Sequence, residues 1–175
     1  MTGVPEIDIL DWLHGEVLNL TLVGGNGVEP PIKENIQKLP FIIDQDRNDD
    51  WLRIPVPGIV VSFGPDAKEV GRLNGLDDWA YNFTIQFFDR EMATQPTEEI
   101  YLAWKTWQRQ VRRLFNQSDA RGELTGLNWL GVPSQEWVEK VRFQTHRLAR
   151  WMVPVTAVVR ETRLAKTHSG GINGE

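Results

Sequence analysis

The chain has 175 residues, with 24 acidic and 19 basic side chains and a net charge of −5 at neutral pH. This length fits one domain, and the acidic balance argues against wholesale binding to nucleic acid while leaving room for a local basic patch. The absence of cysteine excludes disulfides, thiolate zinc sites and cysteine nucleophiles. No apolar run has the length of a membrane span and no signal-peptide pattern is present, so we expect a soluble protein made in the cytosol.

The first predicted element is an amphipathic helix within residues 5–22, because Leu10, Leu13, Val17 and Leu20 recur at three- and four-residue steps. A glycine-rich turn at 24–27 ends it. Prolines then recur up to residue 57 and exclude long regular elements. We therefore expect a long loop over residues 24–57, with a short strand at 39–43.

Two strands are predicted next. Residues 59–63 are an apolar, β-branched run between glycines, which is typical of a buried strand. Residues 65–78 predict a hairpin or extended loop because they are rich in glycine, asparagine and aspartate. From residue 81 to 87, aromatic or aliphatic residues alternate with polar ones, which predicts a half-buried strand.

The second predicted helix covers residues 98–115. Its apolar stripe consists of Ile100, Trp104, Trp107, Val111 and Leu114, and its opposite side carries Lys105, Arg109, Arg112 and Arg113. A second loop is expected at 116–137, followed by strands at 137–145 and 151–161. Pro154 predicts that the last strand lies at a sheet edge or is bulged there. The polar tail 165–175 is expected to be disordered.

These elements predict an α+β fold in one domain of residues 1–164. Antiparallel strands with the helices gathered on one face make a two-layer sandwich. We expect a mainly antiparallel sheet of about four strands, with both helices packed on one face.

No catalytic set is evident in the sequence, and we expect a protein that is not an enzyme and binds neither cofactor nor metal. Asp44, Asp46, Asn48 and Asp50 resemble the opening of a calcium loop. Such a loop needs glycine at its sixth position and glutamate at its twelfth, where this chain has Asp49 and Pro55. A hydrolase or metal-dependent enzyme built on the acidic loop 44–50 is the enzymatic alternative.

Basic and aromatic residues are the candidates for a partner interface. The basic set comprises Arg109, Arg112 and Arg113 of the second helix and Arg142, Arg147 and Arg150 of the last hairpin. These arginines could line one surface that contacts DNA phosphates or an acidic partner, or they could be solvated charges. Trp51, Trp79 and Trp129 fall in predicted loops, where a large aromatic is hard to bury, and so indicate an oligomer or docking surface.

The order of elements resembles the tail-terminator (tail-completion) proteins of long-tailed bacteriophages. The shared pattern is an amphipathic helix, a short strand flanked by proline and glycine, an alternating aromatic strand, a second amphipathic helix and a strand hairpin. These correspond to residues 7–20, 57–63, 81–88, 98–115 and 138–160. Residues 28–56, 116–137 and the polar tail depart from the family pattern.

The resemblance implies a structural protein of the virion tail or neck, assembled in the host cytoplasm. Such proteins close as a homo-oligomeric ring on the finished tail tube and provide the surface to which the head docks. The implied partners are further copies of the chain, the tail tube protein and head–tail connector or neck proteins. Contact with the sheath or with DNA in the lumen is also possible, and no membrane is implied. A connector or neck adaptor, and a nucleic-acid-binding module, are the alternatives.

Overall fold

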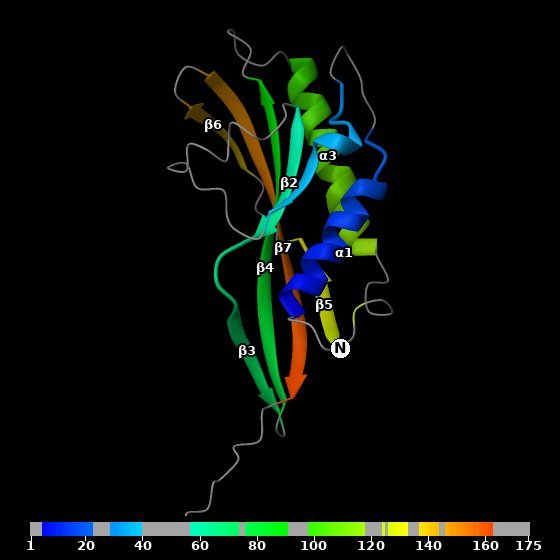
Figure 1. Cartoon of the computed structure of the whole chain (residues 1–175), viewed down its shortest axis with the longest axis vertical. Helices are drawn as coiled ribbons and strands as arrows, with labels where there is room; N and C mark the ends of the chain where they lie inside the picture. Colours follow the sequence, from blue (N-terminus) through cyan, green and yellow to red (C-terminus); the bar gives the residue numbers. More distant parts are fainter. Residues whose placement is uncertain are drawn as a thin grey trace, which may run out of the picture.

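The chain forms an open sheet with two helices packed against one face (Figure 1). The computed structural model describes residues 5–22, 29–39, 57–73, 76–90, 98–117, 124, 126–132, 137–143 and 146–162. Its helices are α1 (Pro5–Asn19), the short 3-10 helix η1 (Lys33–Asn35) and α3 (Glu98–Gln117). Its strands are β1 (Ile36–Leu39), β2 (Gly58–Phe63), β3 (Lys68–Leu73), β4 (Leu76–Arg90), β5 (Leu127–Gly131), β6 (Trp137–Phe143) and β7 (His146–Thr162).

Two long antiparallel strands, β4 and β7, form the centre of the sheet. They pair from Leu76 opposite Thr162 to Arg90 opposite Leu148. β2 and β3 pair one after the other with the outer edge of β4, and β6 and β5 do the same along β7. β1 adds to β2 and is the single parallel strand among the described ones. The sheet is therefore mixed, with antiparallel pairing nearly throughout.

The alternating pattern of β4 places its apolar side chains against the helices. Tyr81, Phe83, Ile85 and Phe87 all belong to the buried core. The ring of Phe87 stacks on Trp151 of β7, with 3.5 Å between ring centroids. Because alternate residues of neighbouring strands share a face, the central pair supplies a continuous apolar floor for both helices.

Both helices bury part of the stripe that the sequence predicts for each, whereas Leu20, beyond the end of α1, and Leu114 are only partly buried. In α1, Leu10, Leu13 and Val17 are buried. In α3, Trp107 and Val111 are buried, while the side chains of Ile100 and Trp104 lie outside the description. Trp12 of α1 and Phe115 of α3 lie 6.1 Å apart between ring centroids, so the two helices contact each other above the sheet.

The predicted number of strands, about four, is wrong, because the described residues contain seven. Of the two alternatives predicted for residues 65–78, the hairpin is confirmed, because β3 pairs antiparallel with the start of β4 up to Leu73 opposite Leu76. The loop predicted at 116–137 is wrong in part, because it contains the end of α3 and β5. The short strand expected at 39–43 begins where β1 ends, at Leu39, and residues 40–43 lie outside the described residues. The missed strands are short or charged, and so lack the apolar alternation that marks β4.

The edge position predicted from Pro154 is also wrong, because β7 is central. Pro154 lies opposite Thr84 on the β4 side. On the other side, the β6 register ends at Met152 and the β5 register begins at Thr156. Pro154 thus falls in the gap between two described strands, where its missing N–H interrupts no ladder.

Polar side chains are buried on the sheet face opposite the helices, where the sequence predicts a half-exposed strand. Thr84 and Gln86 of β4 and Ser62 of β2 are exposed by only 9%, 1% and 0%. The hydroxyl oxygens of Ser62 and Thr84 are 2.9 Å apart, and Gln86 Nε2 donates to Thr84 Oγ1 at 3.2 Å. These hydrogen bonds offset part of the cost of burying polar groups.

Candidate partner interface

Helix α3 presents basic side chains away from the sheet. From residue 100 to its end it contains Lys105, Arg109, Arg112 and Arg113 and no acidic residue. Arg109 and Arg113 are exposed and one helical turn apart, and Leu102, which is 52% exposed, lies on the same side two turns before Arg109. We call Leu102, Arg109 and Arg113 the α3 ridge. It combines positive charge with an exposed apolar side chain.

The arginines of the last hairpin lie in a different layer. Arg147 pairs with Arg142 of β6, and Arg150 lies between Glu139 of β6 and Phe88 of β4 in the sheet register. Arg109 and Arg113 instead point away from the sheet, because the opposite side of α3 is the buried one. By backbone position, the arginines of α3 and those of the last hairpin therefore belong to different layers of the fold.

The three tryptophans that the sequence places in loops have different surroundings. Trp79 lies in β4 opposite Val159 and packs partly buried against the core, so its loop assignment is wrong. Trp129 also lies in a strand, β5, yet its side chain is 45% exposed. Trp51 lies outside the described residues. Of Trp79 and Trp129, only Trp129 therefore has an accessible indole.

Trp129 is held outward by an irregularity of β5. The β5–β7 register shifts between Leu127 and Trp129, which is a β-bulge. Leu127 and Leu130 therefore both face the core, and Trp129 lies on the other face opposite Val158. Its ring covers Gly131, where a Cβ atom would lie 2.2 Å from the indole. Only glycine leaves room for this ring position.

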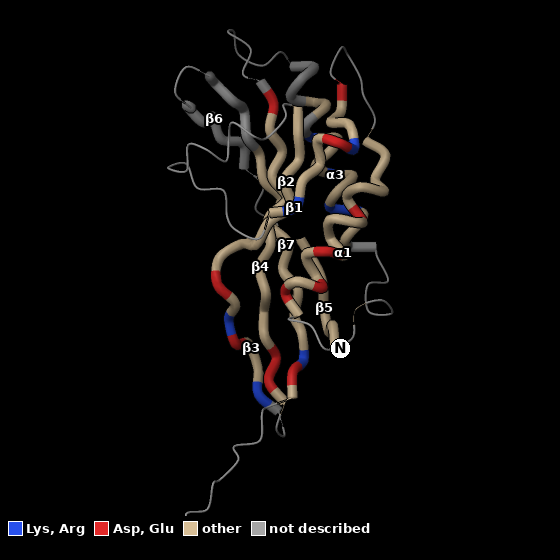
Figure 2. Tube along the Cα trace, viewed as in Figure 1, with Lys and Arg blue, Asp and Glu red and all other residues tan. Residues whose placement is uncertain are grey.

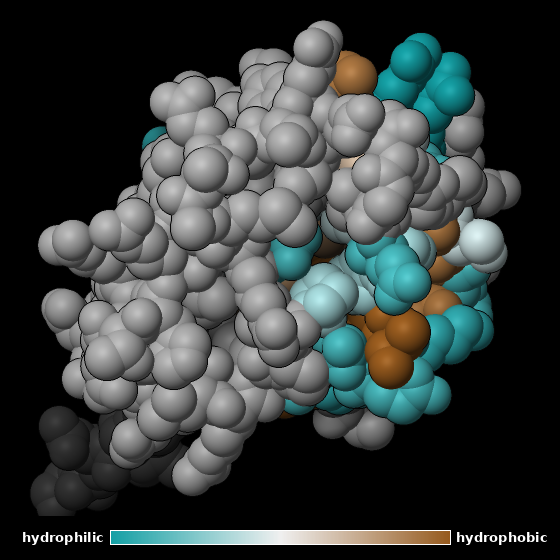
Figure 3. Space-filling view, turned by 90° about the horizontal axis from the view of Figure 1, so that it is seen from above, coloured by the Kyte–Doolittle hydropathy of each residue, from teal (hydrophilic) through white to brown (hydrophobic). Residues whose placement is uncertain are grey.

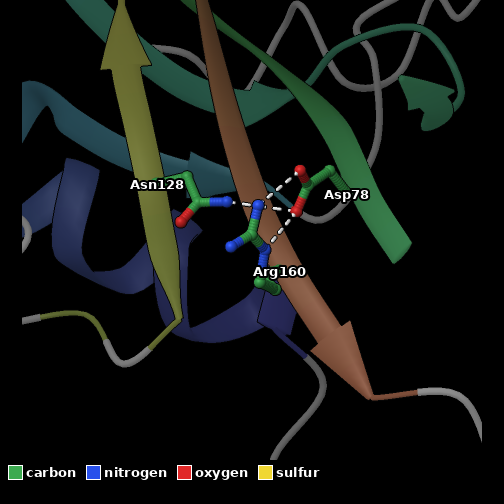
Figure 4. Close-up of polar contacts among 3 residues, drawn as sticks. All are labelled: Asp78, Asn128 and Arg160. Carbon is green, nitrogen blue, oxygen red and sulfur yellow. Dashed lines mark hydrogen bonds and ion pairs between the residues drawn. The ribbon is translucent and has the colours of Figure 1, made fainter. Parts of the chain in front are cut away.

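A polar cluster joins β4, β5 and β7 next to Trp129 (Figure 4). Arg160 donates to Asp78 from Nε at 2.9 Å and from Nη2 at 3.0 Å, and Asn128 Nδ2 donates to the same carboxylate at 3.1 Å. The pKa of Asp78 is lowered, mainly because its carboxylate accepts hydrogen bonds from Arg160. The charge of Arg160 and the hydrogen bond from Asn128 lower this pKa further, whereas desolvation raises it. The cluster fixes the strand that carries Trp129.

The end of the sheet that extends beyond α1 carries alternating charges (Figure 2). The charged residues there are Lys68, Glu69, Arg72, Asp77, Asp78, Arg160 and Glu161. Arg72 pairs with Glu69 within β3, and Arg160 pairs with Asp78. Because opposite charges pair at this end, it forms a mixed surface and does not form a basic patch.

Exposed apolar residues are scattered elsewhere on the described surface. Ile7, Ile32 and Val70 are 49%, 60% and 53% exposed. Seen from the upper end of Figure 1, apolar areas lie among hydrophilic ones (Figure 3). Isolated apolar residues are ordinary on a folded surface, so an interface must be argued from their combination with other groups.

The described residues show neither a metal-binding cluster nor a membrane-spanning helix. They contain no group of three or more histidine, aspartate or glutamate side chains arranged to hold a metal ion. Their helices include none that is long and apolar enough to cross a membrane. The acidic segment 44–50, which resembles part of a calcium loop, lies outside the described residues. No protein-family model and no curated protein matches the chain.

Proposed function

We propose that the protein is a non-enzymatic assembly protein of a long-tailed bacteriophage, a tail terminator that caps the tail tube as an oligomeric ring and joins it to the head. The order of its elements supports this proposal, as does the α+β architecture that the order produces. A head–tail connector or neck adaptor is the closest alternative, since it too works by binding neighbouring proteins.

The single observation that carries the proposal is the outward indole of Trp129. The indole is 45% exposed and lies over Gly131. The preceding residue in β5, Asn128, is hydrogen-bonded to Asp78. A rigid aromatic side chain loses little conformational freedom on binding, and tryptophan is enriched among residues that dominate interface energies. An aromatic held this way suits contact with a protein partner.

A second surface lies on the other side of the molecule. The α3 ridge faces away from the sheet on the helix side, whereas Trp129 lies on the opposite sheet face. A ring subunit that caps a tube needs surfaces for its neighbours in the ring, whose head-to-tail contacts close on themselves, and a separate surface for the tube. The separation of these two surfaces is compatible with such a subunit.

The test is the mass of the purified protein by light scattering across concentration, with negative-stain images and cosedimentation with purified tail tubes. The proposal expects discrete rings or capped tube ends. A protein that neither self-associates nor binds tubes contradicts it. Binding to the portal complex without binding to tubes would identify the connector alternative.

Nucleic-acid binding is the second candidate, and the α3 ridge favours it. Residues 100–117 carry four basic side chains without an acidic one. If this helix binds phosphates, affinity for duplex DNA should fall steeply with salt, and Arg109→Gln with Arg113→Gln should reduce the slope by about two. The matched control is Lys33→Gln, an exposed base of η1. Affinity that does not change with salt excludes this candidate.

A further inference from the structure

A pocket of about 380 Å³ opens between the first turn of α1 and the edge of the sheet. It is lined by α1, by the connection between β2 and β3, and by the middle of β4. The lining residues are Glu6, Ile7, Phe63, Gly64, Pro65, Asp66, Ala67, Tyr81, Asn82 and Phe83. Its size is at the lower end of the range for small-ligand sites, so it can hold one long side chain.

An interruption in the edge of the sheet creates the pocket. Phe63 pairs with Phe83 and Lys68 with Ala80, so four residues on the edge lie opposite two on β4. The amide of Gly64 donates to the carbonyl of Asn82 at 2.7 Å, and a Cβ at Gly64 would lie 3.0 Å from the Asn82 backbone. The four residues of the edge leave a hollow here, and the buried side chains of Tyr81 and Phe83 line its inner wall.

The pocket combines an apolar floor with an acidic rim. The rings of Phe63 and Phe83 lie 5.9 Å apart, and the neighbouring Ile7 is 49% exposed. The charged residues that line the pocket are Glu6 and Asp66, both acidic. Such a pocket suits a cation on an apolar stem, because the stem contacts the floor and the charge meets carboxylates and aromatic faces.

The hydroxyl of Tyr81 lies close to further acidic side chains. It donates to Glu161, and its pKa is raised above the ordinary value, mainly by burial. The hydrogen bond to Glu161 and the charges of Glu161 and Glu6 raise it further. A guanidinium that enters the pocket would therefore meet the negative charges of Glu6 and Asp66 beside a protonated phenol.

We propose that this pocket binds an arginine of the α3 ridge from a second copy of the chain. The inference rests on the proposed self-association and names its contact. The ridge supplies what the pocket lacks, since Arg109 and Arg113 are exposed cations and Leu102 is an exposed apolar side chain beside them. Arginine suits such a site because its planar guanidinium stacks on rings and binds carboxylates with two hydrogen bonds.

The contact is head-to-tail. The pocket involves α1, β2 and β4, whereas α3 packs against β5 and β7. Each copy thus offers a pocket to one neighbour and a ridge to another, which permits a closed ring or an open chain.

The experiment reverses the charges of each half separately and then mixes the two variants. The pocket variant is Glu6→Lys with Asp66→Lys, and the ridge variant is Arg109→Glu with Arg113→Glu. Each alone should self-associate about tenfold or more weakly in sedimentation velocity, because like charges then face each other. Their equimolar mixture should recover assembly, since a reversed pocket accepts a reversed ridge and the two unchanged halves also match.

Controls separate this contact from general charge effects and from misfolding. Lys33→Glu and Glu34→Lys reverse exposed charges of η1 and should leave association unchanged. Circular dichroism and thermal melts verify folding, and the single variants Asp66→Lys and Arg109→Glu, at exposed positions, replace any double variant that does not fold.

Three results would overturn the proposed contact: a monomeric wild-type protein, full association by both reversed variants, or a mixture that stays dissociated. Cosedimentation with tail tubes distinguishes these outcomes from failure of the proposed function. Tube binding by a monomer would retain the function and remove the contact. Rings formed by both reversed variants would likewise retain the function and remove this contact.

Discussion

Asp78, at the extended end of the sheet, is paired through both of its carboxylate oxygens. Arg160 binds both of its oxygens and Asn128 adds a third hydrogen bond. The backbone supports the same pair, since the amide of Arg160 donates to the carbonyl of Gly126, whose φ of 81° favours glycine. A side-chain cluster and a turn thus act together on β5.

Replacing Asp78 should change stability in a pH-dependent way. Because its pKa is lowered in the folded state, ionised Asp78 contributes stability above its ordinary value of 3.8, and this contribution is lost as pH falls through the folded pKa. We expect Asp78→Asn to lower the melting temperature at neutral pH, and the difference from wild type to shrink below pH 4. Glu34→Gln, an exposed change in η1, is the control. A difference that is constant with pH would contradict this assignment.

Tyr81 should show the opposite dependence at alkaline pH. Its raised pKa means that the fold favours the protonated phenol, so this stability is present below the ordinary value of 10.0 and is lost as pH rises above it. Tyr81→Phe should cost about 1–3 kcal/mol at neutral pH, because the bond to Glu161 is lost. Urea denaturation should show the gap closing above pH 10. A gap that widens there would contradict the prediction.

At the scale of elements, one face of α3 packs in the core and the opposite face is exposed. Trp107 is 1% exposed and packs in the core, whereas Leu102 is 52% exposed on the ridge. We expect Trp107→Ala to destabilise the protein by about 3–5 kcal/mol, and Leu102→Ala to stay within about 0.5 kcal/mol. Chemical denaturation measures both. Equal costs would mean that the helix packs through another face.

The elements that the sequence predicts correctly are those whose apolar period is complete. α1, α3 and β4 each bury a continuous stripe, so one pattern fixes both their type and their buried face. β3 contains charged residues around Gly71 and exposes Val70, and β5 has a bulge that breaks its alternation. Their structure comes from pairing with β4 and β7, which are distant in sequence, and a local pattern does not report such pairing.

The candidate partner interface is predictable from the sequence only in part. Arg109 and Arg113 follow from helical periodicity, and residue type alone suggests the tryptophans as candidates. Which tryptophan is exposed depends on strand register, since Trp79 faces the core and Trp129 faces outward. The pocket joins the first turn of α1 to Asp66 and Tyr81, and only the folded sheet brings these together.

At the scale of the whole molecule, three separate surfaces are available for assembly. The pocket and the α3 ridge are complementary in charge, and Trp129 lies on the sheet face opposite the helices. If pocket and ridge join copies of the chain, the Trp129 face remains open to a different partner. The tail tube or a neck protein would then bind there without competing with ring closure.

Changing Trp129 tests this division between surfaces. Because the indole is 45% exposed and its covered part lies over Gly131, Trp129→Ser should lower the free energy of unfolding by only about 1 kcal/mol. It should weaken cosedimentation with tail tubes by about tenfold or more, as loss of an aromatic anchor does, while self-association stays unchanged. Ile32→Ser, at a residue 60% exposed on another surface, is the matched control and should affect neither. Loss of self-association by Trp129→Ser would place this face between copies of the chain. Unchanged binding to both tubes and neck proteins would remove Trp129 from the interface.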